Sequence, residues 1–273
     1  MKTLRYLLYA LVILGAGGLL AYEALIEKNL DSANVIKCGL IIAAAVLGMV
    51  KAPKSRIVNK KAVYQKAYNE FIQGAFQEEP KLERQFYNAI HDYNQDKYSH
   101  AIAKLEKLRK ECHRSKEICA VSIFMGLCWD DMGMYPHAAQ YYADALRMRP
   151  NASIASNLGL CYQRMGKTEE AEDCYRQSIA MDSQYAIGYN NLSVLYFRKA
   201  DYREALDLAR QAIAIDNNFA QALSTAALCC GLLGDREGYD QYYHLAVSNG
   251  YDGQRIIATL NRMRAEAAEL SME

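Results

Sequence analysis

Two long apolar segments open the chain, separated by a short polar stretch. Tyr6–Tyr22 carries no charge, and Ser32–Val50 is interrupted only by Lys37. With its neighbours, each run approaches the ~20 residues that a helix needs to cross a bilayer. The pattern predicts two membrane-spanning helices at about residues 4–23 and 33–51, joined as a hairpin within residues 1–52.

The charges around this hairpin predict its orientation. Basic residues lie on the outer side of both spans, and three acids lie in the connection: Lys2, Arg5, Lys51, Lys54, Arg56, Lys60 and Lys61 against Glu23, Glu27 and Asp31. Because positive charge is retained in the cytoplasm, we expect a multi-pass membrane protein whose N-terminus and C-terminal body are both cytoplasmic. In an alternative, residues 1–22 are a cleaved signal peptide. The body is cytoplasmic in that case too.

Residues 53–81 are expected to form a linker that contains an amphipathic helix. From Lys60 to Phe76 the apolar residues come in pairs at every fourth position, which places them on one stripe: Val63/Tyr64, Ala67/Tyr68, Phe71/Ile72 and Ala75/Phe76. Lysines 60, 61 and 66 are compatible with a helix lying in the membrane interface. The alternative, that the stripe packs on the following domain, is favoured because the basic residues are few and acids follow at positions 70, 78 and 79.

Small residues recur at a fixed interval of ~34 residues through the second half of the chain. The template Gly126, Gly133, Ala138 and Ala145 returns as Gly159, Gly166, Ala171 and Ser178, as Ser193, Ala200, Ala205 and Ala212, and as Ala227, Gly234, Tyr239 and Ala246. Aromatic residues, such as Tyr142 and Tyr175, keep the same step. Four positions in register indicate stacked repeats that bury a shared core.

These residues resemble the tetratricopeptide repeat, a helix–turn–helix unit of about 34 residues. The resemblance implies an all-α fold in which the hairpin is followed by a right-handed α-solenoid over residues 82–251. The units are expected at 82–115 (degenerate), 119–151, 152–185, 186–219 and 220–251. After Asp252, apolar residues at helical spacing predict a C-terminal capping helix within 252–273, with Arg264 on its outer face.

The resemblance also implies where a partner binds. In this family the first helices of the units line a concave groove that holds peptides or partner helices. Carried over by position, the groove comprises Ile123, Leu127, Asp130, Asp131, Ser156, Asn157, Leu160, Gln163, Arg164, Asn190, Asn191, Val194, Phe197 and Arg198.

Two pairs within this set occupy equivalent positions. Asn157 and Asn191 have amides that can pair with a peptide backbone, although a helix-packing role is equally compatible with their position. Arg164 and Arg198 suit a ligand with acidic side chains around an apolar anchor. Alternatively, the two arginines are only solvated surface residues.

Composition excludes several other classes of protein. Lys+Arg (32) and Asp+Glu (31) nearly cancel, so a strongly basic nucleic-acid-binding protein is not expected. Neither a phosphate-binding glycine loop nor a catalytic motif is present, so we expect no enzyme and no cofactor. Cys128, Cys161 and Cys229 share one register and are interpreted as small core residues. Cys112, His113 and Cys119 are the only local metal-like group and lack a second ligand pair, so no metal site is expected.

The sequence therefore predicts a membrane-anchored adaptor or scaffold whose cytoplasmic repeats bind a protein or peptide. The alternative is a structural or accessory subunit of a membrane complex, in which the hairpin packs against other spans.

Overall fold

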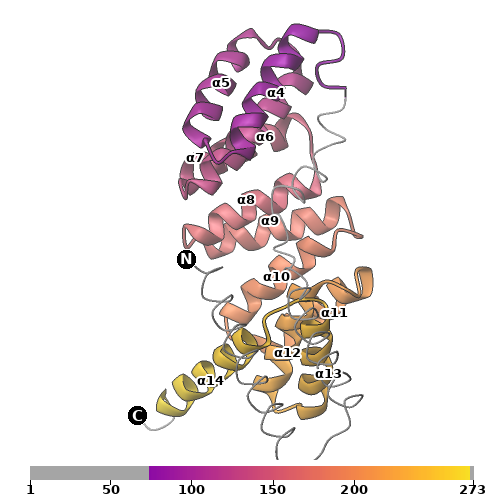
Figure 1. The fold of residues 1–273 in the computed structure, drawn as a ribbon. Helices are drawn as coiled ribbons and strands as arrows, with labels where there is room; N and C mark the ends of the chain where they lie inside the picture. The colour runs from indigo at the N-terminus through magenta and orange to yellow at the C-terminus, as the bar shows by residue number, and fades with distance from the viewer. Residues whose placement is uncertain (1–73, 271–273) are drawn as a thin grey trace, which may run out of the picture. The chain divides into compact units, whose positions relative to one another are not determined.

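A computed structural model describes residues 74–270, and these fold entirely into α-helices and turns (Figure 1). The helices are α4 (Pro80–Asn94), α5 (Tyr98–Glu111), α6 (Ser115–Asp131), α7 (Tyr135–Met148), α8 (Ala152–Arg164), α9 (Thr168–Met181), α10 (Ala186–Arg198), α11 (Tyr202–Ile215), α12 (Ala220–Leu233), α13 (Arg236–Ser248) and α14 (Gly253–Leu270). The two predicted spans and most of the amphipathic stripe lie outside the described residues. Within residues 74–270, every helix is too short or too polar to cross a membrane.

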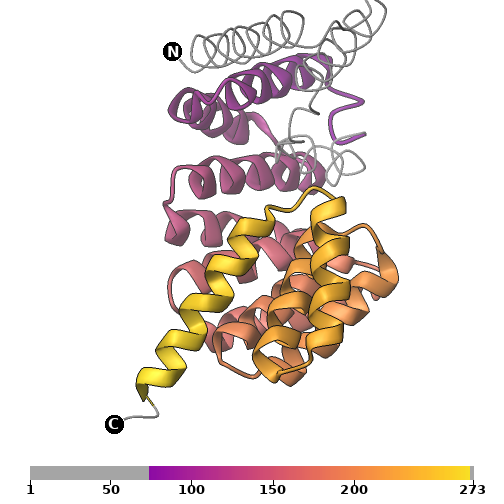
Figure 2. The same ribbon diagram turned by 60° about the horizontal axis from the view of Figure 1, so that its bottom comes forward.

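The helices pack as pairs in chain order. The closest partners are α4 with α5, α6 with α7, α8 with α9, α10 with α11 and α12 with α13, and the second helix of each pair packs on the first helix of the next. Figures 1 and 2 show this succession, with α14 leaving the last pair at an angle. Helices α8, α10 and α12 begin at the residues where the periodicity starts each unit, whereas α6 begins four residues early, at Ser115.

Tight packing within a pair explains why the repeat requires small residues. A Cβ atom at Gly159 would lie 2.7 Å from Cε1 of Tyr175, and one at Gly126 would lie 2.7 Å from Cε1 of Tyr142. Both tyrosines are completely buried. The missing side chain on the first helix therefore provides the space that the ring on the second helix fills.

The turn inside each pair also follows the repeat. Gly133, Gly166 and Gly234 adopt positive φ angles of 74°, 76° and 81°, a conformation that glycine adopts without steric cost. In the third unit, Ala200 takes the same place with φ 60°. A non-glycine residue there stores strain of about 1–2 kcal/mol.

The residues that precede α4 differ from the sequence expectation. Ala75 and Phe76, which the apolar stripe places at the end of a helix, lie in a turn. They are nevertheless buried, with 3% and 2% of their surface exposed, and the ring of Phe76 lies 4.8 Å from that of Phe86 in α4. Gly74, with φ 91°, has the left-handed conformation that commonly terminates a helix.

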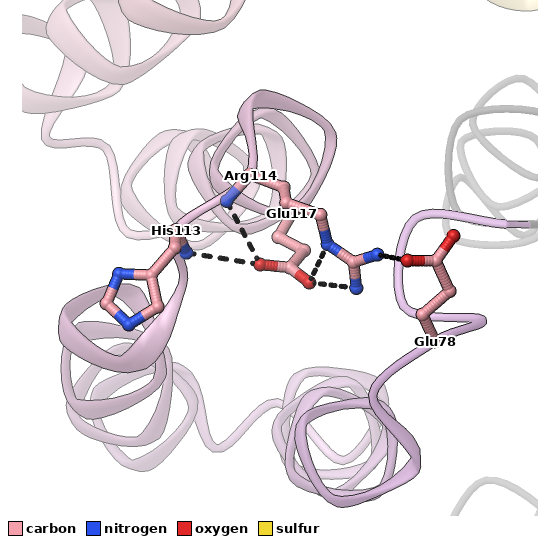
Figure 3. A network of polar contacts seen from close by, with 4 residues as sticks. All are labelled: Glu78, His113, Arg114 and Glu117. Carbon is pink, nitrogen blue, oxygen red and sulfur yellow. Dashed lines mark hydrogen bonds and ion pairs between the residues drawn. The ribbon is translucent and has the colours of Figure 1, made fainter.

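A buried carboxylate joins this turn to the start of α6 (Figure 3). Glu117 is 2% exposed and accepts hydrogen bonds from the side chain of Arg114, at 2.6 and 2.8 Å, and from the backbone N–H groups of His113 and Arg114. Arg114 Nη1 in turn donates to Glu78 Oε2 at 2.6 Å. Burial raises the pKa of Glu117, but these hydrogen bonds outweigh it and lower the pKa overall. The same bonds cap the N-terminus of α6, which accounts for its early start.

At the other end, α14 covers the last pair. Ile256 and Leu260 are buried, and Asp252 Oδ1 accepts a hydrogen bond from the backbone of Gln254 at 3.0 Å. Arg264 is exposed, as expected of the outer face, and it also makes a contact that the spacing does not predict. Its Nη2 donates to the carbonyl of Gly231 at 2.6 Å and so ties α14 to α12. Gly231 allows α14 to approach closely, because a Cβ atom there would lie 2.9 Å from Leu260.

The described cysteines pack as small core residues. All seven are buried thiols, including Cys128, Cys161 and Cys229 in the first helices of three pairs. Among the described residues, no three His, Cys, Asp or Glu side chains are grouped as metal ligands would be.

Candidate functional site

The groove positions predicted from the repeat fall into an open part and a closed part. The open part lies on α8 and α10. Leu160, Asn191, Val194 and Phe197 are half-buried there, and Arg164 and Arg198 are exposed. On α10 the spacing of positions 190, 194, 197 and 198 places these side chains on one face of the helix. These two helices therefore present a mixed apolar and polar surface.

The closed part lies on α6, where the sequence expectation is wrong for two residues. Ile123 and Leu127 are only 1% and 2% exposed. Every residue from Cys119 to Cys128 is buried. A helix buried on all sides over this length offers no open surface, so these two residues belong to the core.

The acidic residues at the end of α6 remain accessible. Asp131 is exposed, and its Oδ2 accepts a hydrogen bond from the hydroxyl of Tyr93 at 2.8 Å. Asp130 is half-buried and lies close enough to Cys161 of α8 to raise the pKa of that thiol, although burial is the larger cause. Of the two carboxylates, Asp130 thus lies near α8.

Polar groups on α8 and α10 are linked across the two units. Asn191 Nδ2 donates to Ser156 Oγ at 2.9 Å, so this amide joins the two first helices. Ser156 is 1% exposed and serves as the acceptor of this bond beneath the surface. Asn157 is itself almost fully buried, at 9%. Asn191 therefore has a packing role between the two units.

Two buried polar atoms beside this link have no hydrogen-bond partner among the described residues. They are Oδ1 of Asn190, a residue 7% exposed, and Nε2 of Gln163. An unsatisfied buried group costs about 1–3 kcal/mol. Both atoms are closed off from solvent in the structure, so a ligand reaches them only if the overlying side chains move.

Tyr175 is a contributor to this surface that the sequence pattern does not reveal. The register identifies it only as an aromatic that fills a gap. In the structure its hydroxyl donates to Oε1 of Gln163 at 3.0 Å and so orients the amide, whose Nε2 has no hydrogen-bond partner among the described residues. The signal available in the sequence is that the ring at this position is tyrosine, whose hydroxyl requires a partner when buried.

Both arginines lie near enough to Tyr175 to affect its hydroxyl. Burial raises the pKa of Tyr175, and Arg198 and Arg164 both act on the same phenol in the opposite direction. Neighbouring lysines are paired, Lys167 with Glu170 at 3.6 Å and Lys199 with Glu172 at 3.1 Å. Within residues 74–270, neither arginine has an ion-pair partner, so two guanidinium groups remain available for an anionic ligand.

The amide-bearing surface is confined to the two middle units. The position of Asn157 and Asn191 is occupied in α6 by Phe124, which packs edge-on against Phe86 at 5.4 Å. In α12 it is Thr225, whose hydroxyl donates to Gln221 within its own helix at 3.1 Å. The candidate site therefore centres on α8 and α10.

Residues 150–218, which contain these two helices, match the family model described as "Tetratricopeptide repeat". The matched segment covers helices α8 to α11, which are therefore similar to tetratricopeptide repeats. No curated protein matches the chain in sequence. The structural comparisons extend the tetratricopeptide fold beyond the matched residues.

Solved structures share this fold at low sequence identity. BtubC (BKLC) from P. vanneervenii has a TM-score of 0.55 and 18% identity, over 76% of this chain and 92% of that chain. MamA from Desulfovibrio magneticus RS-1 has a TM-score of 0.53 and 13% identity, over 62% and 94%. YrrB, described as a TPR protein with an unusual peptide-binding site, has a TM-score of 0.51 and 16% identity, over 69% and 96%. The described helices thus form an all-α tetratricopeptide solenoid.

Proposed function

We propose that this protein is a membrane-anchored, non-catalytic adaptor whose cytoplasmic tetratricopeptide repeats bind a protein or peptide on α8 and α10. The observation that supports the proposal most is the pair of exposed guanidinium groups, Arg164 and Arg198, which have no ion-pair partner within residues 74–270 and lie on the same two helices as the apolar surface. YrrB, which shares the fold, is described as having a peptide-binding site, which supports the same kind of role here.

The chemistry of the surface narrows the partner. Leu160, Val194 and Phe197 are half-buried and provide an apolar contact area. The amide atoms of Asn190 and Gln163 that lack a partner among the described residues lie beneath this surface, and they become available to a peptide backbone only if the side chains above them move. We propose a partner segment in which acidic side chains flank one apolar anchor, because charge-assisted bonds to two arginines favour carboxylates.

Peptide binding tests this proposal directly. The probe is a fluorescein-labelled peptide with one central Leu between glutamates, and its binding to the full-length chain is followed by anisotropy. Changing both Arg164→Glu and Arg198→Glu should weaken binding on the order of a hundredfold, since each charge-assisted bond contributes roughly 1.5–3 kcal/mol. A peptide with lysines in place of the glutamates should bind the reversed protein better than the original.

A matched control distinguishes the effect of Arg164 and Arg198 from the effect of the change in net charge. Arg203 and Arg236 are exposed on α11 and α13, away from the site, and their replacement by glutamate changes the net charge equally. This control should bind the acidic peptide nearly as the parent does. Equal binding by the parent and the Arg164/Arg198 variant would refute the site.

The membrane anchor is a separate part of the proposal and rests on the apolar runs and their flanking charges. Protease added to sealed, right-side-out vesicles should spare the repeats if the body is cytoplasmic. A partner that remains bound after the arginine reversal, and requires residues 1–52, would favour the alternative of a subunit whose hairpin packs against other spans.

A further inference from the structure

One position at the end of each first helix changes its chemistry from unit to unit. It is occupied by Asp131 in α6, Arg164 in α8, Arg198 in α10 and Leu232 in α12, each one repeat length from the next. We call these four residues the edge row. Its three charged members are exposed, and Leu232 is half-buried. The row therefore presents one anion, two cations and one apolar side chain, in that order along the chain.

Contacts between neighbouring units show that the members of the row also follow one another in space. Figure 1 shows α6, α8, α10 and α12 succeeding one another along the stack, and α10 contacts both α8 and α12. The hydrogen bond from Asn191 to Ser156, at 2.9 Å, holds α10 in register with α8. At the end of α6, Asp130 lies close enough to Cys161 of α8 to raise the pKa of that thiol. The end of α6, where Asp131 follows Asp130, therefore adjoins α8.

The anionic member of the row is held in place from beneath. The hydroxyl of Tyr93, a residue that is 1% exposed, donates to Oδ2 of Asp131 at 2.8 Å. No basic side chain within residues 74–270 forms an ion pair with Asp131, and the same is true of the acidic side chains there for Arg164 and Arg198. All three charges of the row are therefore available to side chains of a partner.

The apolar part of the candidate site continues from α10 onto α12. Leu160, Val194 and Leu228 occupy equivalent positions in α8, α10 and α12, and all three are half-buried. The equivalent residue of α6, Leu127, is only 2% exposed. Apolar contact is therefore available from α8 to α12, whereas α6 contributes charge at its end.

We infer that the partner extends its acidic–apolar–acidic segment by a basic side chain that meets Asp131 of α6 and an apolar side chain that meets Leu232 of α12. The inference rests on the proposed function, which places the two acidic side chains at Arg164 and Arg198. With this order every member of the edge row meets complementary chemistry, whereas a third acid at α6 is repelled by Asp131. Packed helices lie about 8–10 Å apart, so an extended chain passes from one member of the row to the next in about three residues.

Extended peptides test this order with the full-length chain and the same anisotropy measurement. The core peptide, with leucine between two glutamates, is given a lysine about three residues beyond one glutamate and a leucine about three residues beyond the other. A second peptide carries the two additions exchanged, so that both chain directions are tested, and a third carries serines as the reference. In one direction, each addition should strengthen binding about three- to fivefold over serine, as expected of one exposed ion pair and one partly buried apolar contact.

Two substitutions assign these gains to the edge row. Asp131→Asn removes the charge but keeps an oxygen that accepts the Tyr93 hydroxyl, and the gain from lysine should vanish while the gain from leucine remains. Asp240→Asn removes an equal charge from an exposed position on α13 and should leave both gains intact. Leu232→Ala should abolish the gain from leucine, whereas Leu245→Ala, on α13 and 40% exposed in the parent, should not.

The inference is overturned if lysine or leucine strengthens binding in neither direction, or if the gains survive Asp131→Asn and Leu232→Ala. The core peptide keeps this result apart from the proposed function. Core binding that depends on Arg164 and Arg198, without a gain from the additions, refutes the order alone. A core peptide that does not bind the parent refutes the proposed function, and the order with it.

Discussion

Replacing Gly159 by alanine should destabilise the protein, although alanine is the better helix former. The new methyl group would lie 2.7 and 2.8 Å from Cε1 and Cδ1 of Tyr175 and 3.1 Å from Cβ of Cys174. The ring has no free space to enter because Tyr175 is completely buried, and its hydroxyl is bonded to Gln163. Either the ring or helix α8 is therefore displaced.

The magnitude follows from three terms. Overpacking costs about 2–3 kcal/mol, and displacement of the ring weakens the Tyr175–Gln163 hydrogen bond, worth about 1 kcal/mol. Alanine in place of glycine inside a helix returns about 1 kcal/mol. The net expectation is a loss of about 2 kcal/mol in the free energy of unfolding.

Urea unfolding followed by circular dichroism measures this difference. A second variant, Gly159→Ala with Tyr175→Leu, supplies the space that the methyl group needs. It should be more stable than the sum of the two single changes predicts, by about 1 kcal/mol or more. If Gly159→Ala alone is as stable as the parent, or the two changes are simply additive, the close contact is not the reason for glycine at this position.

Three further changes test other parts of the structure. Ala200→Gly should raise the free energy of unfolding by about 1 kcal/mol, because glycine relieves the strain at φ 60°; the urea midpoint measures it, and an unchanged midpoint would contradict the strain. Glu172→Gln removes a carboxylate whose pKa is lowered to about 2. The hydrogen bond from the Tyr196 hydroxyl is the largest cause, burial opposes it, and Lys199 and Arg176 lower the pKa further. Because that pKa is lowered, the ionised carboxylate stabilises the parent fully above about pH 4.5 and no longer does so as the pH falls toward 2. The variant should therefore be less stable than the parent above about pH 4.5, and the difference should vanish toward pH 2 when unfolding is measured across that range. Glu117→Gln should lower the free energy of unfolding by about 2 kcal/mol at pH 7, because the hydrogen bonds from Arg114 and the α6 cap lose the negative charge of the buried carboxylate. A variant that is as stable as the parent would show that this network does not stabilise the protein.

The repeat pattern predicts much of the described fold because it reflects local packing. Small residues are needed wherever two helices approach closely, so Gly126 and Gly159 mark the packing of α6 and α8 directly. The positive φ angles at Gly133 and Gly166 likewise mark the turns. These constraints act within one unit and are therefore visible in its sequence.

The errors concern relations between units. Register places Ile123 and Leu127 on the inner face of α6 but does not show how deeply they are buried. Arg264 is exposed, as its spacing indicates, but the spacing does not reveal that its long side chain also reaches the carbonyl of Gly231. The role of Tyr175 in orienting Gln163 depends on its hydroxyl, whereas the repeat register identifies Tyr175 only as a large aromatic residue that fills the core. Each of these depends on contacts that the repeat pattern does not encode.

The distribution of buried thiols gives the protein a built-in set of reporters for local opening. Cys128, Cys161 and Cys229 lie in three different helix pairs, and all are 0% exposed. Burial raises the pKa of Cys229 to about 12, so this thiol reacts with alkylating reagents only when its pair opens. Alkylation rates at the three sites, read peptide by peptide, would rank how often each pair opens under native conditions. Closed pairs would also protect these thiols from oxidation, so loss of that protection would mark the pair that unfolds first.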